Sequence, residues 1–369
     1  MSEEDFEQPD GAGDEPELPP PRENAELVGH GAAESLLLSA YNSGRLPHAW
    51  LIAGPKGVGK ATLAYRFARF LLAEPPAGGL FGAPPKADSL AVAADHPVFR
   101  LVASGGHPDL LAVERGWDIK RKRLRSEIVV EDTRAIAAFL HLTSAQGGWR
   151  VVIVDGANDM NRNAANALLK VLEEPPKRAV LLLTSESPGR LLPTIRSRCR
   201  MLHLKKIPET IVSEAIMRQS PDLTPADALA LAQLAEGSIG RALILAAMDG
   251  LSIHRDMYRI LAEIPKIDTE SLYGFAERLA RGEGQGFRLL AELLPAALTR
   301  MIELALGQGA GTPPAERETL ARLAARRGLD QWVEVWRKIC HLFAAAEGIE
   351  LDRKQVVVSA FFALEEAVR

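Results

Sequence analysis

The first half of the chain alternates between short apolar runs and stretches with helical periodicity. Runs of strand length, bounded by turn-forming residues, lie at residues 49–52, 109–114, 151–154 and 178–187. Between them the pattern predicts helices, the clearest from Lys60 to Ala73 and over residues 161–174. Strands that alternate with helices over residues 25–206 predict an α/β domain, a parallel sheet with helices on both faces.

After Lys206 the strand signals stop and the pattern is helical. We expect a small helical lid at 207–250 and an all-α C-terminal domain at 251–369. Trp332, Trp336, Ile339 and Phe343 follow helical spacing and predict one packing face of a helix. Residues 74–108 are dense in Pro, Gly and Ala, which predicts a surface excursion and not a core element.

Composition narrows the class of protein. The chain has 369 residues, 47% of them hydrophobic, and its sequence has no apolar run long enough to predict a membrane span. Residues 1–24 carry a net charge of −8 and the remainder +4, so we expect a disordered acidic tail. The start is acidic where a secretory signal is basic and then apolar, which predicts a cytoplasmic protein with no membrane contact. Cys199 and Cys340 are too few for a thiolate zinc site.

The stretch "AGPKGVGKATLA" (53–64) has the spacing of a phosphate-binding loop, with Gly54, Gly57, Gly59 and Lys60 between a strand and a helix. Such loops carry a hydroxyl after the lysine to bind Mg²⁺, and here that position is Ala61. Thr62 is one place too late, on a helix face turned by about 100°.

The second part of a nucleotide site is an acid at the end of a neighbouring strand, and "VVIVDGAND" supplies Asp155. Gly156 follows it, at the place where a glutamate would orient the attacking water. Because Ala61 and Gly156 remove two groups of one reaction, we expect no useful ATP hydrolysis. Whether ATP or ADP occupies the loop without hydrolysis stays open.

The motifs "GRLPHAWLIAGPKGVGKATLA", "HPDLL", "VVIVDGANDMNRNAANALLKVLEEPP" and "LPTIRSRC" stand in the order and spacing of a known family. Over about residues 25–245 the chain resembles the bacterial clamp-loader AAA+ proteins, in particular their non-hydrolysing subunit. The ATP-hydrolysing gamma/tau subunits keep the Mg²⁺ hydroxyl and the acidic pair that this chain lacks.

The resemblance implies a stator, that is, a subunit that does not hydrolyse ATP itself but contributes to ATP hydrolysis in the neighbouring subunit. Arg198, in the motif Ser197-Arg198-Cys199, would be an arginine finger supplied in trans to a gamma/tau ATPase. The implied partners are gamma/tau and delta subunits in a heteropentamer, with the C-terminal domain as oligomerisation collar, and through the complex the sliding clamp and primed DNA. By complex membership the chain belongs with DNA-directed DNA polymerase. The alternative is an autonomous AAA+ ATPase or gamma/tau-like motor.

The resemblance also suggests nucleotide-sensing positions. A polar sensor falls on Thr184 or Ser185, with Ser185 favoured by counting back from Ser197, although a buried hydroxyl bonded to backbone fits equally well. The lid reads "GSIGRAL", so Arg241 is displaced by one place from the sensing position, which is Gly240. Many relatives carry a four-cysteine zinc module after the first helix, but residues 74–106 contain no cysteine, so no zinc is expected.

The basic run Lys120, Arg121, Lys122, Arg123 and Arg125 admits two interpretations. It suits contact with a nucleic-acid backbone or another subunit. A solvated loop at a hairpin tip is the simpler reading.

Overall fold

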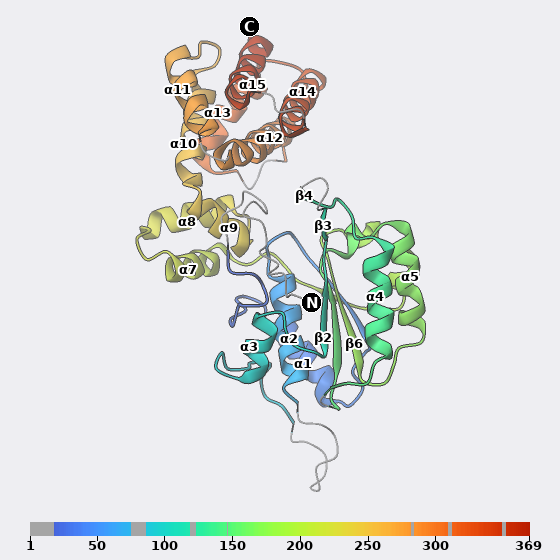
Figure 1. Ribbon diagram of the computed structural model, residues 1–369. Helices are drawn as coiled ribbons and strands as arrows, with labels where there is room; N and C mark the ends of the chain where they lie inside the picture. The colour runs from blue at the N-terminus through green and yellow to red at the C-terminus, as the bar shows by residue number, and fades with distance from the viewer. Residues whose placement is uncertain are drawn as a thin grey trace, which may run out of the picture. The chain divides into compact units, whose positions relative to one another are not determined.

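A computed structural model describes residues 18–74, 86–118, 123–145, 147–281, 284–308, 312–348 and 352–369 (Figure 1). Its contacts divide the chain into two units, with the boundary between Leu243 and Ile244 in helix α9 (Ile239–Ala247). The finer predicted partition into 1–24, 25–206, 207–250 and 251–369 stays a prediction. Residues 1–17 of the predicted tail lie outside the described residues.

The N-terminal unit is built on a sheet of parallel strands, in the order β2-β5-β6-β1-β7. The strands are β1 (Ala49–Ala53), β2 (Leu110–Val113), β5 (Arg150–Val154), β6 (Ala179–Ser185) and β7 (Arg200–His203). The predicted fold class and the four predicted strands, which correspond to β1, β2, β5 and β6, are confirmed, whereas β7 was not among the predicted apolar runs. It is an edge strand that is exposed at Arg200 and His203, so it lacks an apolar run.

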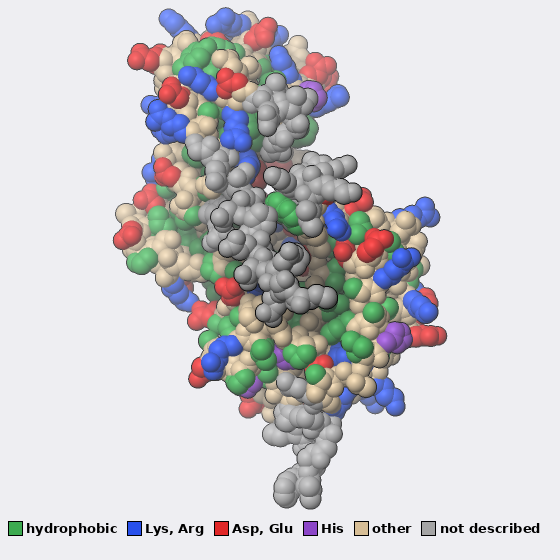
Figure 2. Space-filling model, in the orientation of Figure 1, with side chains coloured by type: hydrophobic (Ala, Val, Ile, Leu, Met, Phe, Trp, Pro, Cys, Tyr) green, Lys and Arg blue, Asp and Glu red, His purple; other side chains and the backbone are tan. Residues whose placement is uncertain are grey.

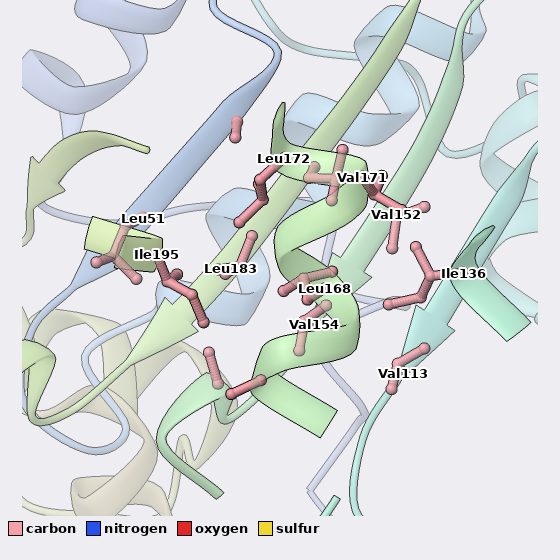
Figure 3. Packing of buried hydrophobic residues seen from close by; sticks show 14 of the residues in the cluster. Leu51, Val113, Ile136, Val152, Val154, Leu168, Val171, Leu172, Leu183 and Ile195 are labelled. Carbon is pink, nitrogen blue, oxygen red and sulfur yellow. The ribbon is translucent and has the colours of Figure 1, made fainter. Parts of the chain in front are cut away.

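Helices cover both faces of this sheet (Figure 1). They are α1 (Gly31–Asn42), α2 (Lys60–Leu72), α3 (Pro97–Ala103), α4 (Val130–His141), α5 (Arg162–Glu173) and α6 (Pro193–Arg196). Helix α2 packs against β1, β5 and β6 on one face. On the other face Val152, Val154 and Leu183 pack with Leu168 of α5 and Ile195 of α6 (Figure 3). Successive side chains of a strand therefore point alternately toward α2 and toward α5.

The predicted surface excursion is wrong for residues 97–103. They form α3, whose Val98, Phe99 and Val102 are buried, and the surrounding Pro, Gly and Ala hid this short apolar face. The buried Arg69 of α2 lies 4.4 Å from the centre of the Phe99 ring. Its guanidinium also donates to Arg22 O (2.8 Å) and Asn24 O (2.6 Å). Residues 22–24, assigned from the sequence to the tail, are thus tied to α2.

After β7 the unit continues with α7 (Glu209–Gln219), α8 (Pro225–Leu234) and the start of α9. Two further short strands, β3 (Trp117–Asp118) and β4 (Arg123–Leu124), pair as an antiparallel hairpin. Short 3₁₀ turns, η1 (Ala157–Asp159) and η2 (Pro188–Arg190), follow β5 and β6.

The C-terminal unit is helical over its described residues. After α9 its helices are α10 (Gly250–Glu263), α11 (Thr269–Ala280), α12 (Gln285–Ala305), α13 (Pro314–Ala324), α14 (Leu329–Gly348) and α15 (Arg353–Val368). The predicted stripe on α14 is a packing face, with Trp332, Ile339 and Phe343 buried and Phe343 against Phe287 at 5.4 Å between ring centres. Trp336 is only half-buried, and its Nε1 donates to Pro295 O (3.3 Å).

On the face of these helices that Figure 2 shows, Lys and Arg side chains are interspersed with Asp and Glu and with hydrophobic side chains. Within the described residues, no helix is both long enough and apolar enough to pass through a bilayer.

Replacing Leu168 by Ala should destabilise the N-terminal unit by about 2–5 kcal/mol, because the side chain is fully buried between α5 and the sheet. Leu142, which is 64% exposed, is the matched control, and Leu142→Ala should change stability by at most about 0.5 kcal/mol. Hydrogen exchange of the β5 and β6 amides, followed by mass spectrometry, measures both. Equal losses in the two variants would contradict this account of the core.

The stability of the C-terminal unit should fall as pH is lowered from about 6.5 toward 4. Burial, with Arg300 and Arg255 nearby, lowers the pKa of His254 to about 4. Glu316 Oε1 lies 3.5 Å from His254 Nε2, but Glu316 is also paired with Arg300 (3.2 Å), so it does not offset the burial. Between these pH values the unfolded chain takes up a proton that the folded chain excludes, which favours unfolding.

The measurement is urea denaturation, followed by circular dichroism, of the wild type and His254→Asn. At pH 4.5 the wild type should lose about 2–3 kcal/mol more than the variant, relative to pH 7.5. Identical pH profiles would show that His254 does not contribute.

Candidate functional site

The predicted phosphate-binding loop lies at the carboxyl end of β1 and leads directly into α2. Its backbone requires glycine at two places, since Gly57 has φ +70° and Gly59, the N-cap of α2, has φ +107°. A Cβ on Gly57 would also lie 2.4 Å from Ser238 Oγ. The loop therefore has the left-handed turns that direct backbone N–H groups toward an anion at the start of a helix.

Lys60, the first residue of α2, is 8% exposed. Its Nζ donates to Pro55 O at 2.6 Å, and Glu186 Oε1 lies 3.9 Å away. Burial lowers the pKa of Lys60, and the carboxylates of Glu186 and Asp155 oppose that effect. The ammonium group that would contact a phosphate is thus already in contact with a carbonyl and near a carboxylate of its own chain.

No side chain in the first turn of α2 replaces the missing Mg²⁺ ligand at Ala61. Thr62 is half-buried, one place beyond. Among the described residues, no cluster of three or more His, Cys, Asp and Glu side chains has the arrangement of a metal site. The predicted absence of zinc stays a prediction, because residues 75–85 lie outside the described part of the chain.

Asp155 directly follows β5, Thr184 lies on the neighbouring strand β6, and a hydrogen bond joins their side chains. Thr184 Oγ1 donates to Asp155 Oδ1 and accepts from the backbone N of Gly156 at 2.9 Å. Both side chains are on the α2 side of the sheet, opposite to Val154 and Leu183. Asp155 therefore lies on the side of the sheet that α2 and Lys60 cover, and its carboxylate accepts a hydrogen bond from a hydroxyl.

The backbone of the turn after Asp155 explains why residue 156 is a glycine. Its φ is +75°, and a Cβ there would lie 2.9 Å from Asp159 Oδ2. A glutamate at this position would be strained in the present backbone. The backbone conformation of this turn therefore favours glycine at position 156 and disfavours an acidic side chain that could orient water.

Thr184 and Ser185, the two candidates for the polar sensor position, lie on opposite faces of β6, and Thr184 is the one that contacts Asp155. Ser185 follows Thr184 on β6 and so points to the α5 side of the sheet. Its Oγ is buried and has no hydrogen-bond partner among the described residues. Counting back from Ser197 favoured Ser185, but a shift of one residue along a strand reverses the face, so the sensor role stays a prediction for either residue.

The start of α9 rests on the phosphate-binding loop. The backbone N of Gly240 donates to Gly57 O at 3.0 Å, and that of Arg241 lies within 3.1 Å of Ser238 Oγ. The Nε of Arg241 is buried without a partner among the described residues. The predicted residue Arg241 is therefore beside the loop, although its role as a nucleotide sensor stays a prediction.

Arg198 lies elsewhere, just past α6, and is 35% exposed. Its Nη2 is 2.7 Å from Glu173 Oε1, at the end of α5, and its Nη1 donates to Thr194 O at 3.0 Å. These partners belong to the α5 side of the molecule, so the guanidinium serves no phosphate in its own loop. The adjacent Cys199 is a poor nucleophile, because burial raises the pKa of its thiol to about 12.

The basic run is only partly covered. Lys120, Arg121 and Lys122 lie outside the described residues, and β3 and β4 flank them as a hairpin. Arg125 Nη1 lies 3.8 Å from Asp132 Oδ1. Contact of this run with DNA stays a prediction.

Two acidic residues at these sites were not singled out from the sequence. Glu186 and Glu173 sit opposite Lys60 and Arg198 respectively. A signal existed for Glu186, because it directly follows a buried strand whose carboxyl end meets the phosphate-binding loop. Glu173 is the last residue of an amphipathic helix and carried no distinguishing signal.

Residues 29–208 match the sequence family described as "DNA polymerase III, delta subunit". This segment belongs to that family. It includes the five-stranded sheet, the phosphate-binding loop and Arg198. The start of α9, with Arg241, lies beyond it.

Individual relatives of the chain are subunits of DNA polymerase III. The chain is 36% identical to DNA polymerase III subunit delta' of Pseudomonas aeruginosa over 222 residues, covering 60% of this chain and 61% of that protein. It is 33% identical to subunit delta' of Escherichia coli, covering 64% of this chain and 66% of that protein. With subunit tau of Escherichia coli the identity is 29%, over 77% of this chain and 41% of that protein. The match thus spans less than two thirds of either delta' relative.

Thr184→Val should destabilise the N-terminal unit by about 1–3 kcal/mol, because it leaves the Asp155 carboxylate and the Gly156 N–H without their shared partner. Ser185→Ala should be nearly neutral, because its hydroxyl has no partner among the described residues. Hydrogen exchange of the β5 and β6 amides measures both variants, with Thr184→Ser as the rescue. A larger loss for Ser185→Ala than for Thr184→Val would show that the Ser185 hydroxyl, and not that of Thr184, stabilises this end of the sheet.

Proposed function

We propose that this chain is a delta prime subunit of a DNA polymerase III clamp loader, a non-hydrolysing stator that acts in the cytoplasm. It joins gamma/tau and delta subunits in a heteropentamer and supplies Arg198 to the ATP site of a neighbouring gamma/tau subunit. The partner's ATP hydrolysis then places the sliding clamp on primed DNA. Family membership of residues 29–208 and the similarity to delta' relatives support this assignment.

The state of the chain's own nucleotide site supports the non-hydrolysing role. Ala61 lacks the Mg²⁺-binding hydroxyl, and the left-handed Gly156 lacks the acid that orients water. No cofactor is required for the stator role. An autonomous ATPase or gamma/tau-like motor would need substitutes for both groups, and Thr62 is not placed to supply the first.

The observation that carries the proposal is the arrangement of Arg198. Its guanidinium is partly exposed, ordered by Thr194 O and Glu173, and engaged with no phosphate-binding residue of its own chain. An ordered, accessible guanidinium at a subunit's surface suits charge stabilisation in a neighbour's transition state.

Arg198→Ala should lower ATP turnover at the adjacent gamma/tau site by about 10³–10⁵-fold, since this is the usual contribution of an arginine finger. The pentamer is reconstituted from purified subunits, and ATP turnover on primed DNA is compared with that of the wild type. Turnover of the whole complex should fall to what the remaining sites support. Size-exclusion chromatography should show unchanged assembly.

The exposed Arg200 of β7 provides a matched control, and Arg200→Ala should leave turnover unchanged. Two results would overturn the proposal. One is rapid ATP turnover by the purified chain alone, which favours the motor alternative. The other is a reconstituted Arg198→Ala complex as fast as the wild type.

A further inference from the structure

Glu186 occupies the place where the carboxyl end of the central strand β6 meets the phosphate-binding loop. It directly follows Ser185, which pairs with Ala53 at the end of β1. The backbone N of Glu186 donates to Asn158 Oδ1 at 3.2 Å, which connects this turn to the one that follows Asp155. The position of the carboxylate is thus set by the ends of β5 and β6.

The side chain of Glu186 faces the one residue that a phosphate would need. Its Oε1 is 3.9 Å from Lys60 Nζ, and the glutamate is 47% exposed whereas the lysine is nearly buried. The ammonium also donates to Pro55 O, so one of its three protons is already used inside the loop. Asp155 adds a second carboxylate whose charge acts on Lys60.

We propose that Glu186 is the specificity determinant of this nucleotide site: its carboxylate takes the place of a terminal phosphate beside Lys60 and excludes nucleoside triphosphates. The argument is electrostatic. A β- or γ-phosphate drawn to Lys60 would meet the carboxylate of Glu186, which is 3.9 Å from the ammonium nitrogen, and would also be repelled by the charge of Asp155. In a working site Mg²⁺ offsets such repulsion, but Ala61 lacks the hydroxyl that would help to hold it.

The phosphate-binding loop itself is retained, so the proposed exclusion of triphosphates comes from the charge of Glu186 and not from a damaged loop. Glycines, lysine and helix N-terminus are all retained, so the backbone cradle still suits phosphate. Removing one negative charge should therefore recover binding, whereas a decayed loop would not respond.

The test is nucleotide binding by the isolated full-length chain, measured by isothermal titration calorimetry with ATP, ADP and AMP, with and without Mg²⁺. Glu186→Gln keeps the size of the side chain and removes its charge. It should tighten ATP binding by about tenfold over the wild type, because it removes the repulsion of one carboxylate, and partial exposure of that carboxylate keeps the gain modest. The gain should decrease from ATP to ADP and vanish for AMP, which has no phosphate near Lys60.

Glu209→Gln is the matched control, since it removes an exposed acid at the start of α7 and should leave affinity unchanged. Combining Glu186→Gln with Lys60→Ala should abolish the gain. Glu186→Ser is a second neutral variant, and thermal unfolding checks that each variant is folded.

Three results would overturn the inference: tight ATP binding by the wild type, no gain in either neutral variant, or an equal gain for AMP. The inference deepens the non-hydrolysing role proposed above, but the two tests are separate. Binding by the isolated chain decides the role of Glu186, and turnover of the reconstituted complex decides the role of Arg198.

Discussion

The ammonium group of Lys60 is nearly buried, and a buried cation must be paired with an anion or with hydrogen-bond acceptors. In a protein that binds and hydrolyses ATP, the phosphates of the nucleotide pair with this lysine. Here the carbonyl of Pro55 and the carboxylate of Glu186 meet that requirement from within the chain. The loop therefore keeps its shape, its glycines and its lysine without needing a nucleotide to stabilise them, and the fold around it can persist with the catalytic groups gone.

The parallel sheet determines which residues lie near Lys60. Because all its strands are parallel, β1, β5 and β6 end at one edge and bring Lys60, Asp155 and Thr184 to the same region. Thr184 then fixes both Asp155 and the turn at Gly156. A left-handed glycine and a bonded carboxylate in one turn leave little room to reinstate a water-orienting acid without rebuilding the backbone.

The sequence predicts those parts of the structure that depend on a local pattern, but it does not determine which of two adjacent residues on a strand faces a given helix. Four apolar runs predicted the strands of the parallel sheet, and the spacing of glycines and lysine predicted the phosphate-binding loop, because each of these signals lies within a short contiguous stretch of sequence. Thr184 and Ser185 are adjacent and chemically similar, and only the pairing of β6 with β1 and β5 shows which one faces α2. The contact of Arg198 with Glu173 joins two helix ends that are separated in sequence, so no local pattern predicts it. For Lys60 and Glu186 the sequence indicates only the position of Glu186 after a buried strand, and the ion pair itself required the structure.

The ion pair of Arg198 with Glu173 bears on whether this arginine can act on a neighbour. A finger held by its own chain must be released, or must reach past its partner, to touch a phosphate. Both side chains are partly exposed, so the pair contributes about 0–1 kcal/mol. A finger supplies 10³–10⁵ in rate, roughly 4–7 kcal/mol at the transition state. The exchange of carboxylate for phosphate is therefore favourable in the proposed assembly, and the ion pair orders the guanidinium beforehand at little cost.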